Sequence, residues 1–254
     1  MAALLLVGVL CAAALSAGEE NTADEDEHAR QLASQVAGSV MPPEELPPNA
    51  LLPPPAQKGT VAGREPKTAD GWELLLVNRW NPIPEDCSPS LIQLKNGLYV
   101  DERCYPALQR MMDACRGAGL SPVICSAYRA WEDQELLFQS KVSQLEDQGY
   151  LLEDAEAEAG TVIALPGTSE HQTGLAVDIV DLNNQKLDRS QEDTAVQGWL
   201  LAHSWEYGFI LRYPSGKSEI TGIIYEPWHY RYVGEAAAKE IHSREICLEE
   251  YLEG

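Results

Sequence analysis

The sequence predicts an α+β domain that follows a long extended N-terminal segment. Short apolar runs typical of strands are mixed with helical stretches, and no regular alternation of strand and helix connects them. The chain has 254 residues, of which 44% are hydrophobic, which is enough for one good-sized globular core. No internal repeat divides it into smaller units. We therefore expect a single domain over residues 70–254.

Two segments precede this domain. Residues 1–17 contain no charged side chain and are rich in Leu, Val and Ala, so they resemble a signal peptide without its positively charged start. An uncleaved membrane anchor is the alternative, although the run is barely long enough to cross a bilayer. Residues 18–69 combine an acidic cluster with repeated proline pairs and are expected to form a disordered tether. We therefore expect an exported protein.

The first half of the domain contains alternating strand and helix patterns. Apolar residues recur at helical spacing after Cys104, and Gly117 ends that pattern, while Gly149 ends a longer amphipathic stretch. Pro166-Gly167 then opens a loop. The expected elements are a strand at 74–77, a helix at 104–118, a buried strand at 122–127, and helices at about 132–148 and 153–162.

The second half begins with an apolar run that ends at a turn formed by Asn183-Asn184. Pro214 and Gly216 mark a loop between two short apolar runs, and an alternating pattern follows His229. The expected elements are a strand at 175–180, a helix at 194–207, paired strands at 209–212 and 222–225, a last strand at 229–233, and a helix at 235–251.

Charge and cysteine content limit the classes of function. A net charge of −22 argues against nucleic acid as a partner and against adhesion to an anionic membrane surface. Of the six cysteines, Cys11 would leave with a signal peptide, and the remaining five cannot all pair within a monomer. A Cys115–Cys125 disulfide and small buried thiols are both compatible with the sequence. The sequence contains no CxxC pair, so it does not predict a structural zinc site.

Two histidines and an aspartate predict a catalytic metal site. His171 lies in the loop before the strand at 175–180, and Gly174 permits a sharp turn into that strand. Asp178 lies within the strand among apolar neighbours, where burial is unfavourable unless the carboxylate is paired or metal-bound. His229 provides a second imidazole, and such a set leaves one zinc coordination position open for water.

Glu226 and Trp228 complete this group of candidates. The carboxylate of Glu226, three residues before His229, is available as a base, and Trp228 would shield one side of the site from water. The alternative is that both histidines are ordinary and that Asp178 caps a turn. His28, His203 and His242 lack a metal-binding pattern, and no GxSxG, EF-hand or phosphate loop is present.

Arg129 follows the strand at 122–127 and is a further candidate. Its ordinary interpretation is a solvated surface ion pair. With Zn²⁺ balanced by the carboxylates of Asp178 and Glu226, however, the guanidinium of Arg129 would make the site net positive. Such a site suits an anionic substrate terminus or a developing oxyanion.

Three motifs of the domain occur together in one known family. They are Ser126-x-Tyr128-Arg129, Ser169-x-His171-x-x-Gly174-x-Ala176-x-Asp178 and Glu226-x-Trp228-His229. With these motifs the domain resembles VanY-type D-alanyl-D-alanine carboxypeptidases, members of the LAS metallopeptidases (lysostaphin, D-Ala-D-Ala peptidases, hedgehog domain). The resemblance covers about residues 72–234, and no metal or base position is substituted. It implies a small antiparallel sheet packed with helices.

The resemblance also implies the role of each site residue. One zinc ion would be held by His171, Asp178 and His229, and Glu226 would be the general base. Substrate would be contacted by Arg129, Ser169, Gln134 and Trp228. Zinc would lower the pKa of its bound water towards about 7, and Glu226 would take the proton as that water attacks the scissile carbonyl.

The implied substrate is the peptidoglycan stem peptide, trimmed of its terminal D-Ala outside the membrane at the bacterial cell wall. L,D-carboxypeptidase, D,D-dipeptidase and endopeptidase activities share the same zinc set and remain alternatives. A non-catalytic zinc-binding module is another, but Glu226 and Arg129 are not needed merely to hold zinc. The sequence does not indicate an oligomeric state.

Overall fold

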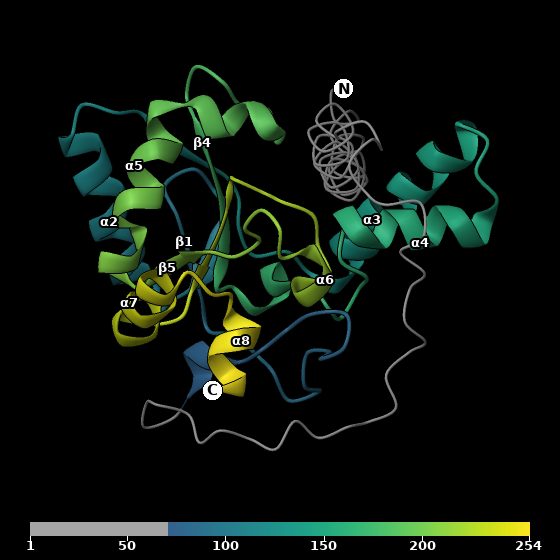
Figure 1. Cartoon of the computed structure of the whole chain (residues 1–254), viewed down its shortest axis with the longest axis horizontal. Helices are drawn as coiled ribbons and strands as arrows, with labels where there is room; N and C mark the ends of the chain where they lie inside the picture. The colour runs from purple at the N-terminus through teal and green to yellow at the C-terminus, as the bar shows by residue number, and fades with distance from the viewer. Residues whose placement is uncertain (1–70) are drawn as a thin grey trace, which may run out of the picture.

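The structure, a computed structural model, describes residues 71–254 (Figure 1). The predicted signal peptide or anchor (1–17) and tether (18–69) lie outside the described residues. The helices are α2 (Tyr105–Gly117), α3 (Trp131–Asp147), α4 (Leu152–Val162), α5 (Ala195–His203), α6 (Ser218–Thr221), α7 (Glu235–Arg244) and α8 (Leu248–Glu253). Short 3-10 turns are η1 (Trp72–Leu74), η2 (Glu170–Thr173), η3 (Arg189–Asp193) and η4 (Ser204–Tyr207).

The central sheet is antiparallel with the strand order β3-β4-β6-β5, and a separate hairpin pairs β1 with β2. This confirms the α+β prediction. In the described part of the chain no helix is long and apolar enough to span a bilayer. The strands are β1 (Leu91–Gln93), β2 (Tyr99–Asp101), β3 (Pro122–Ser126), β4 (Ala176–Asp181), β5 (Phe209–Leu211) and β6 (His229–Tyr232).

The two faces of the sheet have different roles. Because opposed residues of antiparallel strands point to the same face, the pairing of Val177 with Tyr230 and of Asp178 with His229 defines these faces. Val177 and Tyr230 belong to the main apolar core, together with residues of α2 and α5. Asp178 and His229 therefore point to the other face, on the side of the sheet where α3 and α4 lie in Figure 1.

Two smaller apolar clusters complete the domain. Helices α3 and α4 pack against each other through side chains such as Phe138, Val142 and Ala159. Helices α7 and α8 pack with β5 through Ile210, Ile241 and Tyr251, among others. The sheet thus has apolar support along one face and at its β5 edge, which leaves the opposite face free for polar groups.

The structure corrects three sequence predictions. The expected strand at 74–77 is instead η1 followed by irregular chain, and the strand at 222–225 does not form, because Ile224 N–H donates to the Thr161 carbonyl at the end of α4. The expected helix at 235–251 is divided into α7 and α8 at Glu245, whose φ of 54° is left-handed. The β1–β2 hairpin was not predicted from sequence.

The cysteines of the described residues form no disulfide. All five cysteines from Cys87 to Cys247 are free thiols, which excludes the Cys115–Cys125 pairing in this structure and favours the alternative of unpaired thiols. Three of them, Cys104, Cys115 and Cys247, are buried.

Candidate active site

The candidate site begins with three side chains in a row across the sheet. Ser126 of β3 is paired with Asp178 of β4, which is in turn paired with His229 of β6. A β-bulge between Ile124 and Ser126 shifts the register of β3 just before this row. Bulges change the direction of the side chains that follow them. Sheet pairing therefore sets the spacing of Asp178 and His229.

His171 reaches this row from the turn η2. Gly174 closes the turn with a φ of +71°, and a Cβ at this position would lie 2.8 Å from the Asp101 backbone nitrogen, so glycine is required. His171 Nδ1 lies 2.6 Å from the Ala127 carbonyl oxygen, to which it donates as the Nδ1–H tautomer. This leaves His171 Nε2 facing Asp178 Oδ2 at 3.3 Å.

Asp178 lies between the two imidazoles. Its Oδ1 is 3.0 Å from His229 Nδ1, so the two histidines present different ring nitrogens to the same carboxylate. One ligand atom from each of the three residues lies within 4.8 Å of the others, and all three residues are buried. Two imidazole nitrogens and a carboxylate oxygen match the ligand preference of zinc.

The electrostatics of these three residues reflect their proximity. Burial alone would raise the pKa of the Asp178 carboxyl, but His171 and His229 outweigh it and hold that pKa well below its usual range. Burial lowers the pKa of His171. For His229 burial also acts to lower the pKa, but its carboxylate neighbours Asp178 and Glu170 raise it to about 9.

Glu226 is the second carboxylate of the site. Its Oε2 lies 3.8 Å from His229 Nδ1, and its backbone N–H donates to the Tyr213 carbonyl. Burial, reinforced by Asp178 and opposed by His229 and Arg129, raises the pKa of Glu226 to about 8. A carboxyl group whose pKa lies near neutral pH can both accept and return a proton there.

Arg129 is buried, which excludes the surface ion pair. Its Nη1 donates to Gln134 Oε1 at 2.8 Å, and its Nη2 donates to Ser126 Oγ at 3.0 Å. Gln134 is held in turn by its donation to the Ala164 carbonyl at 2.6 Å. The two acceptors found for Arg129 within the described residues are neutral, so its positive charge is directed towards the site without a carboxylate partner.

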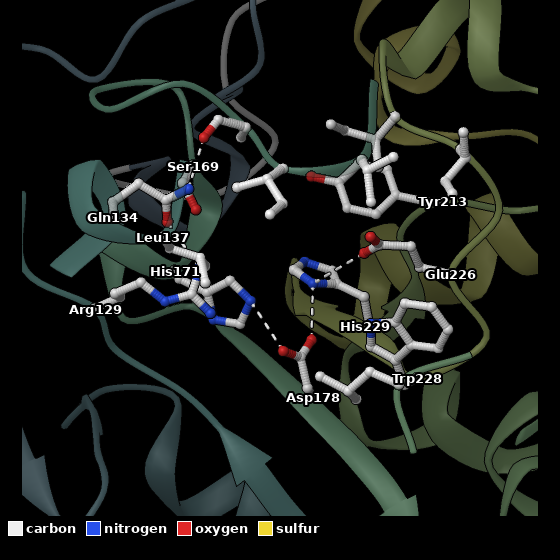
Figure 2. A pocket seen from close by; sticks show the side chains of 16 residues that line it. Arg129, Gln134, Leu137, Ser169, His171, Asp178, Tyr213, Glu226, Trp228 and His229 are labelled. Carbon is white, nitrogen blue, oxygen red and sulfur yellow. Dashed lines mark hydrogen bonds and ion pairs between the residues drawn. The ribbon is translucent and has the colours of Figure 1, made fainter. Parts of the chain in front are cut away.

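One pocket contains all the predicted site residues. Figure 2 shows Arg129, Gln134 and Ser169 on one side of it and Glu226, Trp228 and His229 on the other. The rest of the lining is mostly apolar and consists of Leu137, Val162, Ile163, Ala164, Leu187, Tyr213, Ile223 and Ile224. His203 and His242 lie outside it, and His28 is outside the described residues.

A buried ion network lies next to the candidate metal ligands and was not predicted. Glu170 Oε1 accepts from Arg212 Nε and Arg231 Nη1, each at 2.7 Å, and Arg212 also pairs with Glu249 of α8 at 2.6 Å. Burial alone would raise the pKa of Glu170, but the two arginines hold it well below its usual range. We call Glu170, Arg212, Arg231 and Glu249 the ion network.

Sequence reasoning missed the ion network because its members are separated by tens of residues. The available indication was Arg231, a charged residue two positions after His229 in a predicted strand, where a buried charge requires a partner. The sequence alone could not identify this partner, because Glu170 is brought into contact with Arg231 only by the fold.

The geometry defines the class of protein. Three buried candidate ligands, a neighbouring carboxyl group with a raised pKa and an arginine without an acidic partner are typical of the centre of a metal-dependent hydrolase. Residues 97–235, more than half of the chain, match the family described as VanY, D-alanyl-D-alanine carboxypeptidase. The chain belongs to this VanY family and is a zinc metallopeptidase of the carboxypeptidase type.

Known relatives support this assignment. The chain is 45% identical over 198 residues to the D-alanyl-D-alanine carboxypeptidase of Enterococcus faecalis, covering 78% of this chain and 72% of that protein. Among solved structures, a zinc-bound glutamate-to-alanine mutant of the vancomycin-resistance D,D-pentapeptidase VanY is 47% identical, with a TM-score of 0.66, covering 71% of this chain and 99% of that one.

Two further solved structures are similar. VanYB in complex with D-alanine-D-alanine is 48% identical, with a TM-score of 0.67, covering 71% of this chain and 97% of that one. The LD-carboxypeptidase LdcB, whose structure concerns peptidoglycan recognition, is 36% identical, with a TM-score of 0.62, covering 72% and 87%. Structural relatives therefore include both D,D- and L,D-enzymes.

Proposed function

We propose that this protein is a D,D-carboxypeptidase that removes the terminal D-Ala from peptidoglycan stem peptides. His171, Asp178 and His229 would hold one zinc ion, and Glu226 would act as the general base. The observation that carries the proposal is the placement of the three-ligand cluster, the basic carboxylate and the buried Arg129 around one pocket. The ligands named for the similar VanY structures, zinc and D-alanine-D-alanine, support it.

Glu226 is assigned the proton transfers of the reaction. A bound zinc ion supplies a Lewis acid that polarises a carbonyl and lowers the pKa of a coordinated water to about 7. Glu226 accepts the proton of the attacking water and later returns it to the departing amine of the terminal residue. Its buried position beside His229 keeps the carboxylate within reach of both steps.

The proposed role of Arg129 is to bind the carboxylate of the substrate or to stabilise the oxyanion that forms during the reaction. Its guanidinium is already oriented by Gln134 and Ser126, so little side-chain entropy is lost on binding. Ser169, also in the lining, offers a hydroxyl on the same side. Trp228 walls the opposite side and limits access of bulk water.

The character of the pocket favours D,D- over L,D-specificity. Asp178 and Glu226 are the only carboxylates among the described lining residues, and both belong to the metal centre. An L,D-enzyme that cleaves after a diamino acid must accommodate an ammonium group near the scissile bond. An alanine methyl group suits the apolar walls formed by Leu137, Ile163 and Ile223 without any further acid.

Product analysis tests this proposal. Zinc-loaded protein is incubated separately with stem pentapeptide, stem tetrapeptide and free D-Ala-D-Ala, and the products are identified by mass. We expect loss of one alanine from the pentapeptide and much slower cleavage of the other two. Preferred cleavage of the tetrapeptide would indicate an L,D-enzyme, preferred cleavage of D-Ala-D-Ala a dipeptidase, and no cleavage of any substrate with zinc bound would refute an enzymatic role.

We also propose that the protein acts outside the cytoplasmic membrane. The uncharged run at 1–17 and the acidic, proline-rich stretch at 18–69 support export followed by a tether, which would let the domain at 70–254 reach a polymeric substrate. Expression of the full chain in a bacterial host, with fractionation and N-terminal sequencing of the product, distinguishes a cleaved signal from a retained anchor. Recovery of full-length protein only from the cytoplasm would contradict export.

A further inference from the structure

Two buried atoms next to the metal ligands lack a hydrogen-bond partner. They are Glu170 Oε2 and His229 Nε2, two of the four such side-chain atoms found among the described residues. They lie 3.6 Å apart, slightly beyond hydrogen-bond distance, and the side chains are 0% and 4% exposed. Unpartnered buried polar atoms are rare, so a facing pair of a donor and an acceptor requires an explanation.

The direction of the His229 ring supplies that explanation. Its Nδ1 faces Asp178 Oδ1, so Nδ1 is the ring nitrogen that would face a metal ion bound beside that carboxylate. A neutral imidazole that ligates through Nδ1 must carry its proton on Nε2. That proton points towards Glu170, whose Oε2 is the facing acceptor.

The Glu170 carboxylate is fixed in this position. Its other oxygen, Oε1, is occupied by Arg212 and Arg231. Arg231 is itself anchored, because its Nη2 donates to the backbone carbonyls of Glu73 and Leu75 at 3.1 and 2.8 Å. Glu170 is therefore not a further metal ligand, because Oε1 is bound by arginines and Oε2 faces the ring edge that is remote from Asp178.

We propose that Glu170 is a positioning residue that accepts the Nε2–H of His229, fixes the ring for metal ligation through Nδ1, and increases the basicity of that nitrogen. The proposal rests on the zinc site described above. A carboxylate, histidine and metal in this order is a recurrent means of orienting a ligand. On metal binding, a small rotation of the imidazole would shorten the 3.6 Å separation to a hydrogen bond.

The two histidines differ in this respect. His171 Nδ1 is fixed by the neutral Ala127 carbonyl, whereas His229 Nε2 faces a charged carboxylate. A charged acceptor forms the stronger hydrogen bond and donates more electron density to the ring. We therefore expect the metal affinity to depend more on the partner of His229 than on that of His171.

Zinc affinity tests the proposal most directly, measured by chelator competition on metal-free full-chain protein. In Glu170→Gln the amide oxygen can satisfy the arginines only if the NH2 group turns towards His229, which favours the tautomer that cannot ligate through Nδ1. We expect the zinc dissociation constant to rise on the order of 10- to 100-fold. The visible spectrum of the Co²⁺-loaded variant should change as well.

Glu170→Asp is the second variant, in case the first fails to fold. It retains the negative charge that Arg212 and Arg231 require but withdraws the oxygens from His229 by about 1.5 Å, one C–C bond length. We expect weakened zinc binding with a smaller loss of stability. A folded aspartate variant with wild-type zinc affinity would overturn the proposal.

Glu249→Gln is the matched control. Glu249 pairs with the same arginine, Arg212, but does not contact a histidine, so this variant should lose stability while its zinc affinity stays within about two-fold. Equal weakening in both glutamine variants would mean that the ion network only stabilises the fold, and would overturn the proposal. Failure of the wild type to bind zinc would refute the metal site itself, a separate result.

Discussion

His229 lies between two groups of charged side chains that have opposite electrostatic character. On its Nδ1 side are Asp178 and Glu226, with Arg129 across the pocket, and the pKa of Glu226 is raised to about 8. On its Nε2 side is the ion network, in which two carboxylates are paired with two arginines and the pKa of Glu170 is strongly lowered. Carboxylates and arginines therefore lie on both sides of His229, but they form ion pairs with each other only in the ion network.

This difference in charge pairing indicates which side chains serve function and which serve stability. Charges without a partner are unfavourable in a folded protein unless a ligand completes them, so the pocket side is arranged for a metal and an anionic substrate. Paired buried charges hold the strands and α8 in place, and removing one partner leaves the other uncompensated. Substitutions on the pocket side should therefore affect activity, and those of Arg212, Arg231 and Glu249 should affect stability. Glu170 belongs to the ion network and also faces His229, so its substitution should affect both zinc binding and stability.

Loss of the metal should have the largest effect. Chelation of zinc, or Asp178→Asn, should abolish measurable peptide hydrolysis, because the cluster loses its ion or the charged ligand that holds it. Activity of the chelated wild type should return on addition of zinc, as measured by D-Ala release. Circular dichroism should show an intact fold in both samples, since the apolar clusters lie elsewhere; residual activity at zero zinc would contradict the assignment.

Removal of the general base should be the next largest effect. Glu226→Gln preserves the shape of the side chain but cannot accept a proton, so kcat should fall about 10²- to 10⁴-fold. Zinc content, measured by atomic absorption, should remain at the wild-type level. A variant that retains wild-type kcat would place the base elsewhere.

Substitution of one arginine on each side of His229 tests directly whether the two sides differ. Arg129→Met should lower kcat/KM by roughly 10²- to 10³-fold. Its unfolding free energy should stay within about 1 kcal/mol of wild type, because removal of an unpaired buried charge offsets the loss of two hydrogen bonds. Arg231→Met should instead lower the unfolding free energy by about 3–5 kcal/mol, because Glu170 loses a buried partner. Denaturant titrations and steady-state kinetics on both variants measure this; matching profiles would mean that the two sides do not differ.

The smallest predicted effect is on the pH dependence of metal-free stability. The pKa of Glu226 rises from 4.5 to about 8 on folding, so its protonated form stabilises the fold below pH 4.5 and that contribution is lost as the pH rises towards 8. Glu226→Gln avoids the buried charge. Metal-free Glu226→Gln should therefore unfold at wild-type denaturant concentrations at pH 5 but be about 1–3 kcal/mol more stable at pH 8. A difference independent of pH would contradict the raised pKa.

Sequence patterns predicted the elements that carry the site. Helices α2, α3 and α4 and strands β3, β4 and β6 formed close to their expected bounds, because each has a clear apolar period or lies between strong turn residues. The pocket contains every candidate site residue. The strongest sequence signal for this site was Asp178, a carboxylate among apolar neighbours that is unfavourable to bury without a partner. The assignment of individual roles stays a prediction.

Other features depended on contacts that sequence does not reveal. The run at 222–225 is apolar enough for a strand, but its backbone is bound by the end of α4 rather than by a neighbouring strand. The sequence around Glu245 has an ordinary helical pattern and does not indicate that the helix ends there. The break allows α8 to pack separately, where Glu249 pairs with Arg212. The ion network joins residues that are 37 to 61 positions apart, beyond any local pattern.

A zinc titration that follows activity tests the central claim most directly. Metal-free wild-type protein and Glu226→Gln are titrated with zinc, and bound zinc and D-Ala released from stem pentapeptide are measured at each addition. The account predicts that activity of the wild type saturates at one zinc per chain, while Glu226→Gln binds one zinc with similar affinity and releases little or no D-Ala. Hydrolysis that does not follow zinc occupancy, or full activity of the zinc-loaded variant, would contradict it.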